Sequence, residues 1–170
     1  MTDAPRVEWD MDAYVRRVRA ACYVCELLAG NPEYFHHVAH RDEIAVVYLC
    51  KYPSLWGHLM VAPIEHKEHL VGDFAPDEYA NLQAVVYRAG RALTAVIETE
   101  RLYLLSLGSQ QGNRHIHYHL VPLPPGVPYE DQQLAAMAVS KGFLDPPFEE
   151  MERLAAAIGA AMREAHVELP

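Results

Sequence analysis

Three histidines stand at every second position in the stretch NRHIHYHLVPLPPG, residues 113–126. Alternate side chains of a β-strand point to the same face, so His115, His117 and His119 would share one face. The intervening residues would then point toward the covering helices: Ile116, Tyr118 and Leu120. A strand face that is merely wetted by solvent more often mixes Thr, Lys, Glu and Ser. The row of imidazoles therefore predicts chemistry rather than solvation.

The spacing of the three histidines indicates that they cannot all act on the same group. Residues rise by ~3.3 Å along a strand, so neighbouring histidines would stand ~7 Å apart and the outer two ~13 Å apart. One phosphate-sized group can touch two adjacent histidines but not all three. A neutral imidazole, with a reference pKa of ~6.5, has one nitrogen free to attack or to bind a metal, while a protonated neighbour can donate to a leaving group. Two of the histidines can thus act on one substrate atom, and the third must bind something else.

A second group of candidate ligands is the cysteine pair in CYVC. Cys22 and Cys25 fit half of a four-ligand zinc site, since thiolates suit Zn²⁺. The same pair also fits a redox couple or two buried cysteines on a helix. His66 and His115 are candidate partners for a metal, and His69 is an alternative to His66.

Composition limits the partners of the chain. The 170 residues suit one domain, with 51% hydrophobic and 22% charged residues. The formal net charge of −9 argues against a nucleic-acid polymer or an anionic membrane as partner, although it permits a small phosphorylated ligand in a locally positive pocket. The N-terminal residues lack the pattern of a signal peptide, and no apolar run approaches the ~20 residues of a membrane helix. With an odd number of cysteines, three, we expect a reduced compartment, the cytoplasm.

The histidine row needs a framework, which the remaining pattern supplies. Apolar periodicity and turn residues predict helices at 11–29, 76–99, 129–141 (short) and 148–166. Apolar and β-rich runs predict strands at 44–50, 58–63, 101–108 and 114–123. Strand pairs followed by long helices indicate an α+β fold with an antiparallel sheet covered on one side.

Trp56 and a second group of histidines are two further features of the sequence. Trp56 precedes a Gly-His pair, where it would either stack on a ligand or cap the core. A second group of histidines, in YFHHVAHRDE, favours a solvated turn over a further metal site: His36, His37 and His40.

Three segments together resemble the histidine triad (HIT) family. HIHYHLV is similar to the triad itself, in which histidines alternate with hydrophobic residues. YPSLWGHLMVAPIEH is similar to the second signature, a proline and a short turn, then Gly-His, an apolar strand and Pro-x-x-His. CYVCELLAG is similar to the opening of zinc-bearing members. The segments follow the family's order, with a long helix between the last two, and span roughly residues 22–123.

The resemblance implies a compact α+β fold with about five antiparallel strands, usually a homodimer. The whole chain, 1–170, would be a single HIT domain with a core at about 22–123 and a C-terminal helical extension at about 124–170. The family cleaves nucleotides at the α-phosphate through a covalent nucleotidyl-histidine. Dinucleoside polyphosphates, nucleoside phosphoramidates and nucleotide sugars all fit this hydrolase or transferase chemistry.

The resemblance also implies a role for each matching residue. His117 would be the nucleophile, and His119 would bind the phosphate and assist the leaving group. The phosphate would also contact residues on the facing strand and in the loop before the triad: His58, Gln111, Gly112 and Asn113. A structural zinc would be held by the zinc-type positions: Cys22, Cys25, His66 and His115.

The chain departs from the family pattern at two places. Cys50 occupies a position where an Asp or Asn often contacts the ribose, and the loop before the triad is shorter, with Ser106 in place of the usual Asn. These changes affect nucleoside recognition rather than phosphate chemistry. Two alternatives remain: a metal-dependent phosphohydrolase in which the histidine row binds the metal, and a nucleotide-binding or sensing module without turnover.

Overall fold

The two most apolar runs of the chain form neighbouring strands at the centre of the fold. In the computed structural model, which describes residues 4–165, these are β3 (Ala45–Leu49) and β4 (Leu59–Pro63). They pair in antiparallel register, and every residue of both strands is buried. A strand that is apolar at every position is typical of a strand covered on both faces.

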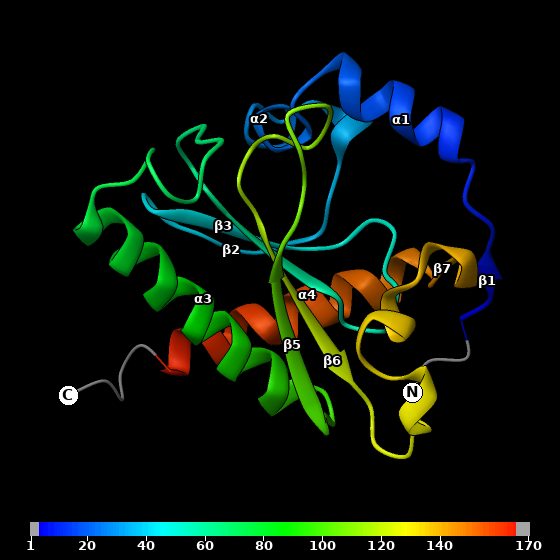
Figure 1. Cartoon of the computed structure of the whole chain (residues 1–170). Coiled ribbons are helices and arrows are strands. Elements are labelled where there is room, and N and C mark those ends of the chain that lie inside the picture. Colours follow the sequence, from blue (N-terminus) through cyan, green and yellow to red (C-terminus); the bar gives the residue numbers. More distant parts are fainter. Residues whose placement is uncertain (1–3, 166–170) are drawn as a thin grey trace.

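Three more strands complete a five-stranded antiparallel sheet with the order β2-β3-β4-β6-β5 (Figure 1). The other strands are β2 (Val38–Arg41) and β5 (Arg101–Ser106), which form the two edges, and β6 (Tyr118–Leu123), which lies between β4 and β5. The predicted α+β fold with about five antiparallel strands is confirmed. The prediction missed β2, the strand that carries His40.

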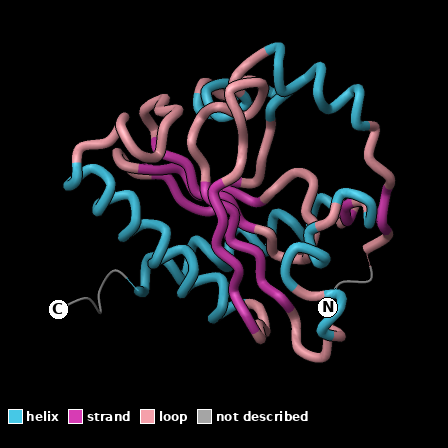
Figure 2. Tube along the Cα trace, viewed as in Figure 1, coloured by secondary structure: helices cyan, strands magenta, loops and turns pink. Residues whose placement is uncertain are grey.

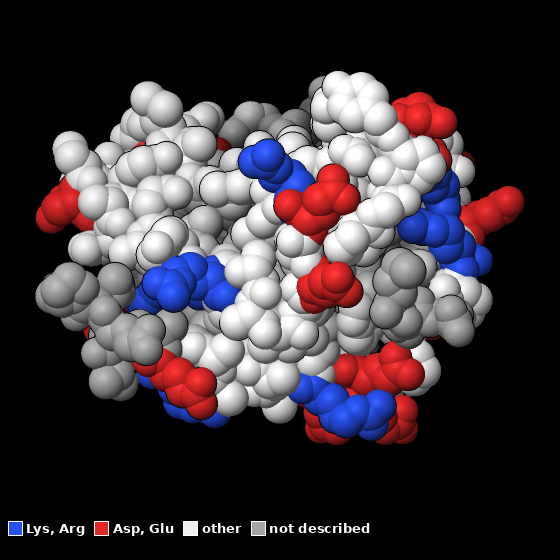
Figure 3. Space-filling view, turned by 90° about the horizontal axis from the view of Figure 1, so that it is seen from below, with Lys and Arg blue, Asp and Glu red and all other residues white. Residues whose placement is uncertain are grey.

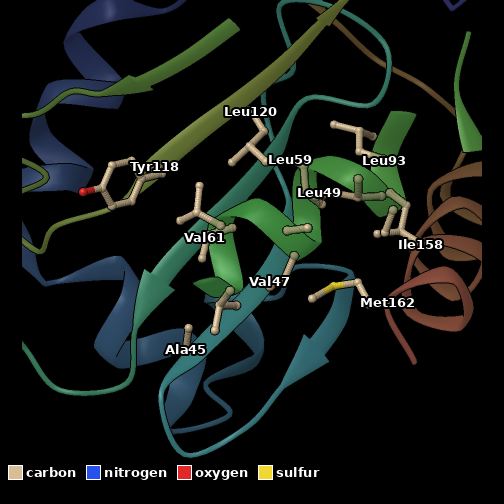
Figure 4. Packing of buried hydrophobic residues seen from close by; sticks show 14 of the residues in the cluster. Ala45, Val47, Leu49, Leu59, Val61, Leu93, Tyr118, Leu120, Ile158 and Met162 are labelled. Atoms are coloured by element: carbon tan, nitrogen blue, oxygen red, sulfur yellow. The ribbon is translucent and has the colours of Figure 1, made fainter. Parts of the chain in front are cut away.

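Two long helices cover one face of the sheet. They are α3 (Pro76–Val96) and α4 (Phe148–Ala165), which pack against each other and against the strands (Figure 1). Alternate residues of the central strands enter this core, as Figure 4 shows for Val47, Val61 and Leu120. The predicted helix-facing residues between the histidines also belong to it: Ile116, Tyr118 and Leu120. The predicted end of the last helix, His166, lies outside the described residues.

The opposite face of the sheet carries a second, smaller core. Val24 of the short helix α2 (Tyr23–Leu28) packs there against Val46, Tyr48 and Met60. The expectation that only one side of the sheet is covered is therefore wrong. The histidine row lies on this second face, because His119 pairs with Met60 across β4 and β6.

The N-terminal helix is interrupted where one continuous helix was predicted. α1 (Met11–Ala20) ends before Ala21, whose backbone is extended, and α2 begins after Cys22. The extended break turns Cys22 toward the histidine row, so tertiary contacts override the helical periodicity of this segment.

The histidine row is also less regular than a continuous strand. β6 begins at Tyr118, whereas the prediction placed its start at Arg114. The N–H of Ile116 donates to the carbonyl of Lys67 at 2.7 Å and not to a neighbouring strand. His115 and His117 thus lie in an irregular segment that leads into the sheet, and only His119 is part of the strand.

The region between β6 and α4 contains short 3-10 turns where one short helix was predicted: Tyr129–Asp131, Gln133–Met137 and Val139–Lys141. A two-stranded ribbon follows, apart from the main sheet, and joins a segment near the N-terminus to the segment just before α4 (Figure 2). It consists of β1 (Arg6–Val7) and β7 (Phe143–Leu144). Among the described residues, no helix combines the length and apolarity that a membrane crossing needs.

Candidate active site and adjoining metal centre

The orientation of His117 is set by a neighbouring backbone carbonyl. Its Nδ1 lies 2.7 Å from the carbonyl oxygen of His115, and because a carbonyl only accepts, Nδ1 carries the hydrogen. Nε2 is then the unprotonated nitrogen. The ring is 2% exposed and packs edge-on against Tyr23, and burial lowers the pKa of His117. The site thus holds a neutral imidazole with a free lone pair.

A second pair of rings forms a directed chain of hydrogen bonds. The backbone N–H of Ser54 lies 3.4 Å from Nδ1 of His58, which makes that nitrogen the acceptor. Nε2 of His58 then donates to Nδ1 of His119 at 2.9 Å. The hydrogen of His119 is therefore on Nε2, the nitrogen that is left to face a ligand. Since the ring of His119 also lies 5.0 Å from that of His117, the donor and the nucleophile are neighbours.

Burial keeps this pair of rings neutral. It lowers the pKa of His58 to about 3, with a smaller contribution from the charge of His117. Burial lowers the pKa of His119 to about 2, and the charges of His58 and His117 lower it further. A neutral His119 with hydrogen on Nε2 can donate to a phosphate oxygen or to a leaving group without first being charged.

His58, His117 and His119 open into one cavity of about 300 Å³. Its wall is largely aromatic: Trp9, Tyr14, Tyr23, Tyr34, Tyr48 and Tyr52. Cys50 also lines it, and burial raises the pKa of that thiol to about 12, so Cys50 is uncharged. Cavities with apolar walls and a few convergent polar groups are typical ligand sites.

The loop before the triad contains three predicted phosphate-binding residues, and the structure places only one of them at the cavity. Asn113 lines the cavity, and its side chain donates to the hydroxyl of Tyr14 at 2.7 Å. The N–H groups of Gln111 and Gly112 instead donate to Ser109 within a tight turn. The structure therefore brings His58 and Asn113 to His117 and His119, but it does not bring Gln111 and Gly112 to this cavity.

The four predicted metal ligands come together in the structure, and one of them is the first histidine of the row. The ligand atoms of Cys22, Cys25, His66 and His115 all lie within 4.8 Å of one another. Nδ1 of His66 is 3.2 Å from Sγ of Cys25, and Nδ1 of His115 is 3.6 and 3.7 Å from the two sulfurs. Tetrahedral zinc with ordinary bond lengths separates its ligand atoms by roughly 3.3–3.8 Å. The donor set and its spacing therefore fit zinc.

The outer nitrogens of both histidines in this cluster are also satisfied. Nε2 of His115 donates to the carbonyl of Pro63 at 3.0 Å, and Nε2 of His66 donates to the carboxylate of Glu68 at 3.0 Å. Both bonds leave Nδ1 free to bind a metal, which is how histidine ligands are usually oriented. His69, the alternative to His66, is not in the cluster.

Other features of the sequence take definite places. Trp56 packs against the main core and not in the cavity. The interpretation of the second histidine group as a solvated turn is wrong: His36 is part-buried, lies 5.2 Å from the ring of Tyr48 and lines the cavity, while His40 is in β2. Sequence reasoning missed Ser54, although its position four residues before the Gly-His histidine was a usable signal.

Comparison with known proteins yields the same architecture. No family model matches the chain. An uncharacterised HIT-like protein of Saccharolobus solfataricus is 24% identical over 104 residues, which cover 59% of this chain and 73% of that protein. The crystal structure of a zinc-bound histidine triad family protein from Mycobacterium smegmatis has a TM-score of 0.66 and 25% identity, over 86% of this chain and 99% of that one. A hypothetical histidine triad nucleotide-binding protein from Sulfolobus tokodaii has a TM-score of 0.66 and 24% identity, over 84% and 93% of the two chains.

The sheet, the covering helices and the alternating histidines define a protein with the histidine triad fold. The chain carries both signature segments of the histidine triad family and is similar to these histidine triad relatives in sequence and fold.

Proposed function

We propose that the protein is a nucleotide hydrolase or nucleotidyl transferase that acts at an α-phosphate through a covalent nucleotidyl-His117. The observation that carries the proposal is the 2.7 Å bond between Nδ1 of His117 and the carbonyl of His115. This bond leaves Nε2 as the free nucleophile, and the same carbonyl would stabilise the positive ring that forms on attack.

In the first step, Nε2 of His117 attacks the α-phosphorus and forms a P–N bond. The bond from phosphorus to the leaving group breaks, and its electron pair stays on the leaving group. Nε2–H of His119 donates a hydrogen bond to the leaving group, which departs as an anion and takes its proton from water, while His58 donates to Nδ1 of His119 and holds that ring in place. Asn113 and His58 line the cavity where the phosphoryl oxygens would lie.

In the second step, water or another acceptor attacks the phosphorus and the P–N bond breaks. Nε2 of His117 recovers its lone pair, and the proton of the acceptor passes to the solvent. Gln111 and Gly112 have no part in this scheme, because they would reach a phosphate only if the turn at 109–112 shifted.

We further propose that Cys22, Cys25, His66 and His115 hold a structural zinc ion. When bound, the ion would supply no open coordination position, since the protein fills all four. Its effect would be mechanical. Helix α2 carries Tyr23 and Cys25 and is preceded by Cys22, and Tyr23 packs on the ring of His117. A zinc ion that links α2 to His115 would hold the ring of Tyr23 in position. It would also hold the carbonyl of His115, which orients His117.

The test of the proposed function is mass spectrometry of the intact chain after mixing with nucleoside phosphoramidates, dinucleoside polyphosphates and nucleotide sugars. A mass increase of one nucleoside monophosphate that maps to His117 supports the proposal. Nucleotide binding with no adduct and no turnover of any of these compounds would favour a sensing module instead.

We also propose a small-molecule partner, a second copy of the chain and a reducing compartment such as the cytoplasm. On the face in Figure 3, acidic and basic side chains are interspersed, which does not suit a nucleic-acid polymer or an anionic membrane. Leu104 on the edge strand β5 and Tyr87 on α3 are 51% and 58% exposed, as expected of an apolar surface that a second copy covers. The three cysteines are free thiols.

A further inference from the structure

The wall of the cavity carries two permanent cations in a chain whose net charge is −9. Arg17 of α1 and Lys51, which follows β3, both line the cavity. Within residues 4–165, no aspartate or glutamate lines it. A positive wall with no counter-charge is suited to an anionic part of a ligand.

Arg17 is held in one orientation by neutral groups. Its guanidinium lies over the ring of Tyr34, with 5.0 Å to the ring centroid, and Nη2 donates to the carbonyl of Glu33. Neither contact neutralises the charge. The guanidinium has five N–H groups, so several remain for a ligand.

Lys51 differs from the other two lysines of the chain. Lys67 pairs with Glu65 and Glu78, and Lys141 pairs with Asp131. Lys51 has no ion pair with any residue that the structure describes, and the same holds for Arg17. Burial lowers the pKa of Lys51, and the charge of Arg17 lowers it further, so the two cations repel each other across the cavity wall. A bound anion would remove this repulsion.

Arg17, Lys51 and the proposed nucleophile, His117, all line the same cavity, so one ligand can contact them together. The rings of His117 and His36 lie 5.7 and 5.8 Å from the ring of Tyr23, so one tyrosine separates them. His36 adjoins the cations, because its Nδ1 lies 2.7 Å from the carbonyl of Tyr34, the residue whose ring lies under Arg17. The positive wall therefore adjoins the site of attack, with Tyr23 between His36 and His117.

We propose that Arg17 and Lys51 form a second phosphate subsite, which binds a phosphate other than the one that His117 attacks. This inference rests on the proposed function and narrows its substrate to nucleotides with at least two phosphates. The second phosphate is either on the sugar or further along the phosphate chain. A sugar hydroxyl is often bound by a carboxylate and a sugar phosphate by arginine, and here the cavity offers the cations.

The experiment is calorimetric titration of the full chain carrying His117→Ala, which cannot turn the ligands over. The probes are nucleoside 5′-monophosphates, nucleoside 3′,5′-bisphosphates and nucleoside 5′-diphosphates of adenosine and guanosine. We expect at least one of the two-phosphate probes to bind tenfold or more tightly than its monophosphate. A gain with the bisphosphate assigns the subsite to a sugar phosphate, and a gain with the diphosphate assigns it to the phosphate chain.

Lys51→Gln and Arg17→Gln, each added to the same background, should remove this gain and leave monophosphate affinity within about twofold. Arg16→Gln is the matched control, since Arg16 is an exposed cation on the same helix that does not line the cavity. Equal affinity for one and two phosphates would overturn the subsite, as would a gain that survives both substitutions. The comparison of one-phosphate with two-phosphate probes uses only the His117→Ala chain. It therefore tests the subsite even if Lys51→Gln or Arg17→Gln impairs folding.

Failure of the subsite and failure of the proposed function give different results. If the unmodified chain forms an adduct with a nucleoside phosphoramidate but shows no preference for two phosphates, only the subsite is wrong. If no nucleotide binds and no adduct forms, both proposals are wrong.

Discussion

Nε2 of His58 lies 2.9 Å from Nδ1 of His119, and this one contact determines which nitrogen of His119 faces the ligand. The direction of the bond follows from Ser54, whose N–H is directed at the other nitrogen of His58. His119 therefore presents N–H, and His117 presents a lone pair. The two rings have opposite roles although both are neutral.

Replacement of His58 by Leu and by Gln tests this directed chain. Leu cannot donate to Nδ1 of His119, so we expect kcat to fall about 100-fold, the usual cost of losing one hydrogen-bond donor to developing negative charge. Gln keeps an N–H donor and should stay within about tenfold of the unmodified protein. Steady-state kinetics with a good leaving group, such as a nitrophenolate, should show little effect of either substitution. An equal loss for good and poor leaving groups would contradict the role of His119 as hydrogen-bond donor to the leaving group.

Replacement of His117 by Gly removes the proposed nucleophile and leaves a space for a free ring. We expect turnover to fall by several orders of magnitude, with a circular dichroism spectrum like that of the unmodified chain. Added imidazole should restore part of the activity. The covalent mechanism at His117 fails if His117→Ala keeps full activity. His36 also lines the cavity with its Nδ1 2.7 Å from a backbone carbonyl, that of Tyr34, so full activity with an adduct on His36 would place the nucleophile there instead.

Removal of one thiolate tests the metal centre. Cys22→Ser should reduce bound zinc from one ion per chain to a small fraction, as measured by elemental analysis. A stability loss of about 2 kcal/mol would lower the Tm by roughly 4–8 °C in a chain of this size. Cys50→Ser is the control, because Cys50 lies outside the cluster and should keep the zinc. Mild chelation should leave the phosphate chemistry intact, whereas immediate loss of activity with an unchanged fold would favour the catalytic-metal alternative.

Stability should depend on pH through His58. Its folded-state pKa is lowered to about 3, whereas in the unfolded chain a histidine has a pKa of ~6.5. Between pH ~6.5 and pH 3, His58 is protonated in the unfolded chain but stays neutral in the folded chain. The free energy of unfolding therefore decreases as the pH falls through this range. From pH 7 to pH 5, His58 alone should lower the free energy of unfolding by about 2 kcal/mol. Urea unfolding at both pH values should show a smaller decrease for His58→Gln, and an identical decrease would rule out a buried neutral His58.

Local patterns were sufficient for the framework and for the candidate ligands. The strand period placed Ile116, Tyr118 and Leu120 on the helix-covered face, because hydrophobic burial follows alternation. The four candidate metal ligands come together as a set. These features depend on residue type and spacing, which are visible in the sequence.

The remaining features depend on contacts between distant segments. β6 starts late because the N–H of Ile116 bonds to Lys67, which no local pattern indicates. His36 was assigned to a solvated turn, and it is part-buried because Tyr23 and Tyr48 pack on it from other elements. No sequence pattern marks Arg17 and Lys51 as functional residues, because only the folded chain places these two unpaired cations in one cavity.

The short β1–β7 ribbon has a consequence for how the cavity opens. Its strands have two residues each, β1 is exposed, and they join segments from opposite ends of the chain, next to lining residues such as Trp9 and Gly142. Small exposed units of this kind separate with far less free energy than a buried sheet. Amide hydrogens of the ribbon should therefore exchange with solvent by local opening, while those of β3 and β4 should require global unfolding. The cavity would then admit its ligand through the least protected part of the fold, with the histidines held in a rigid frame.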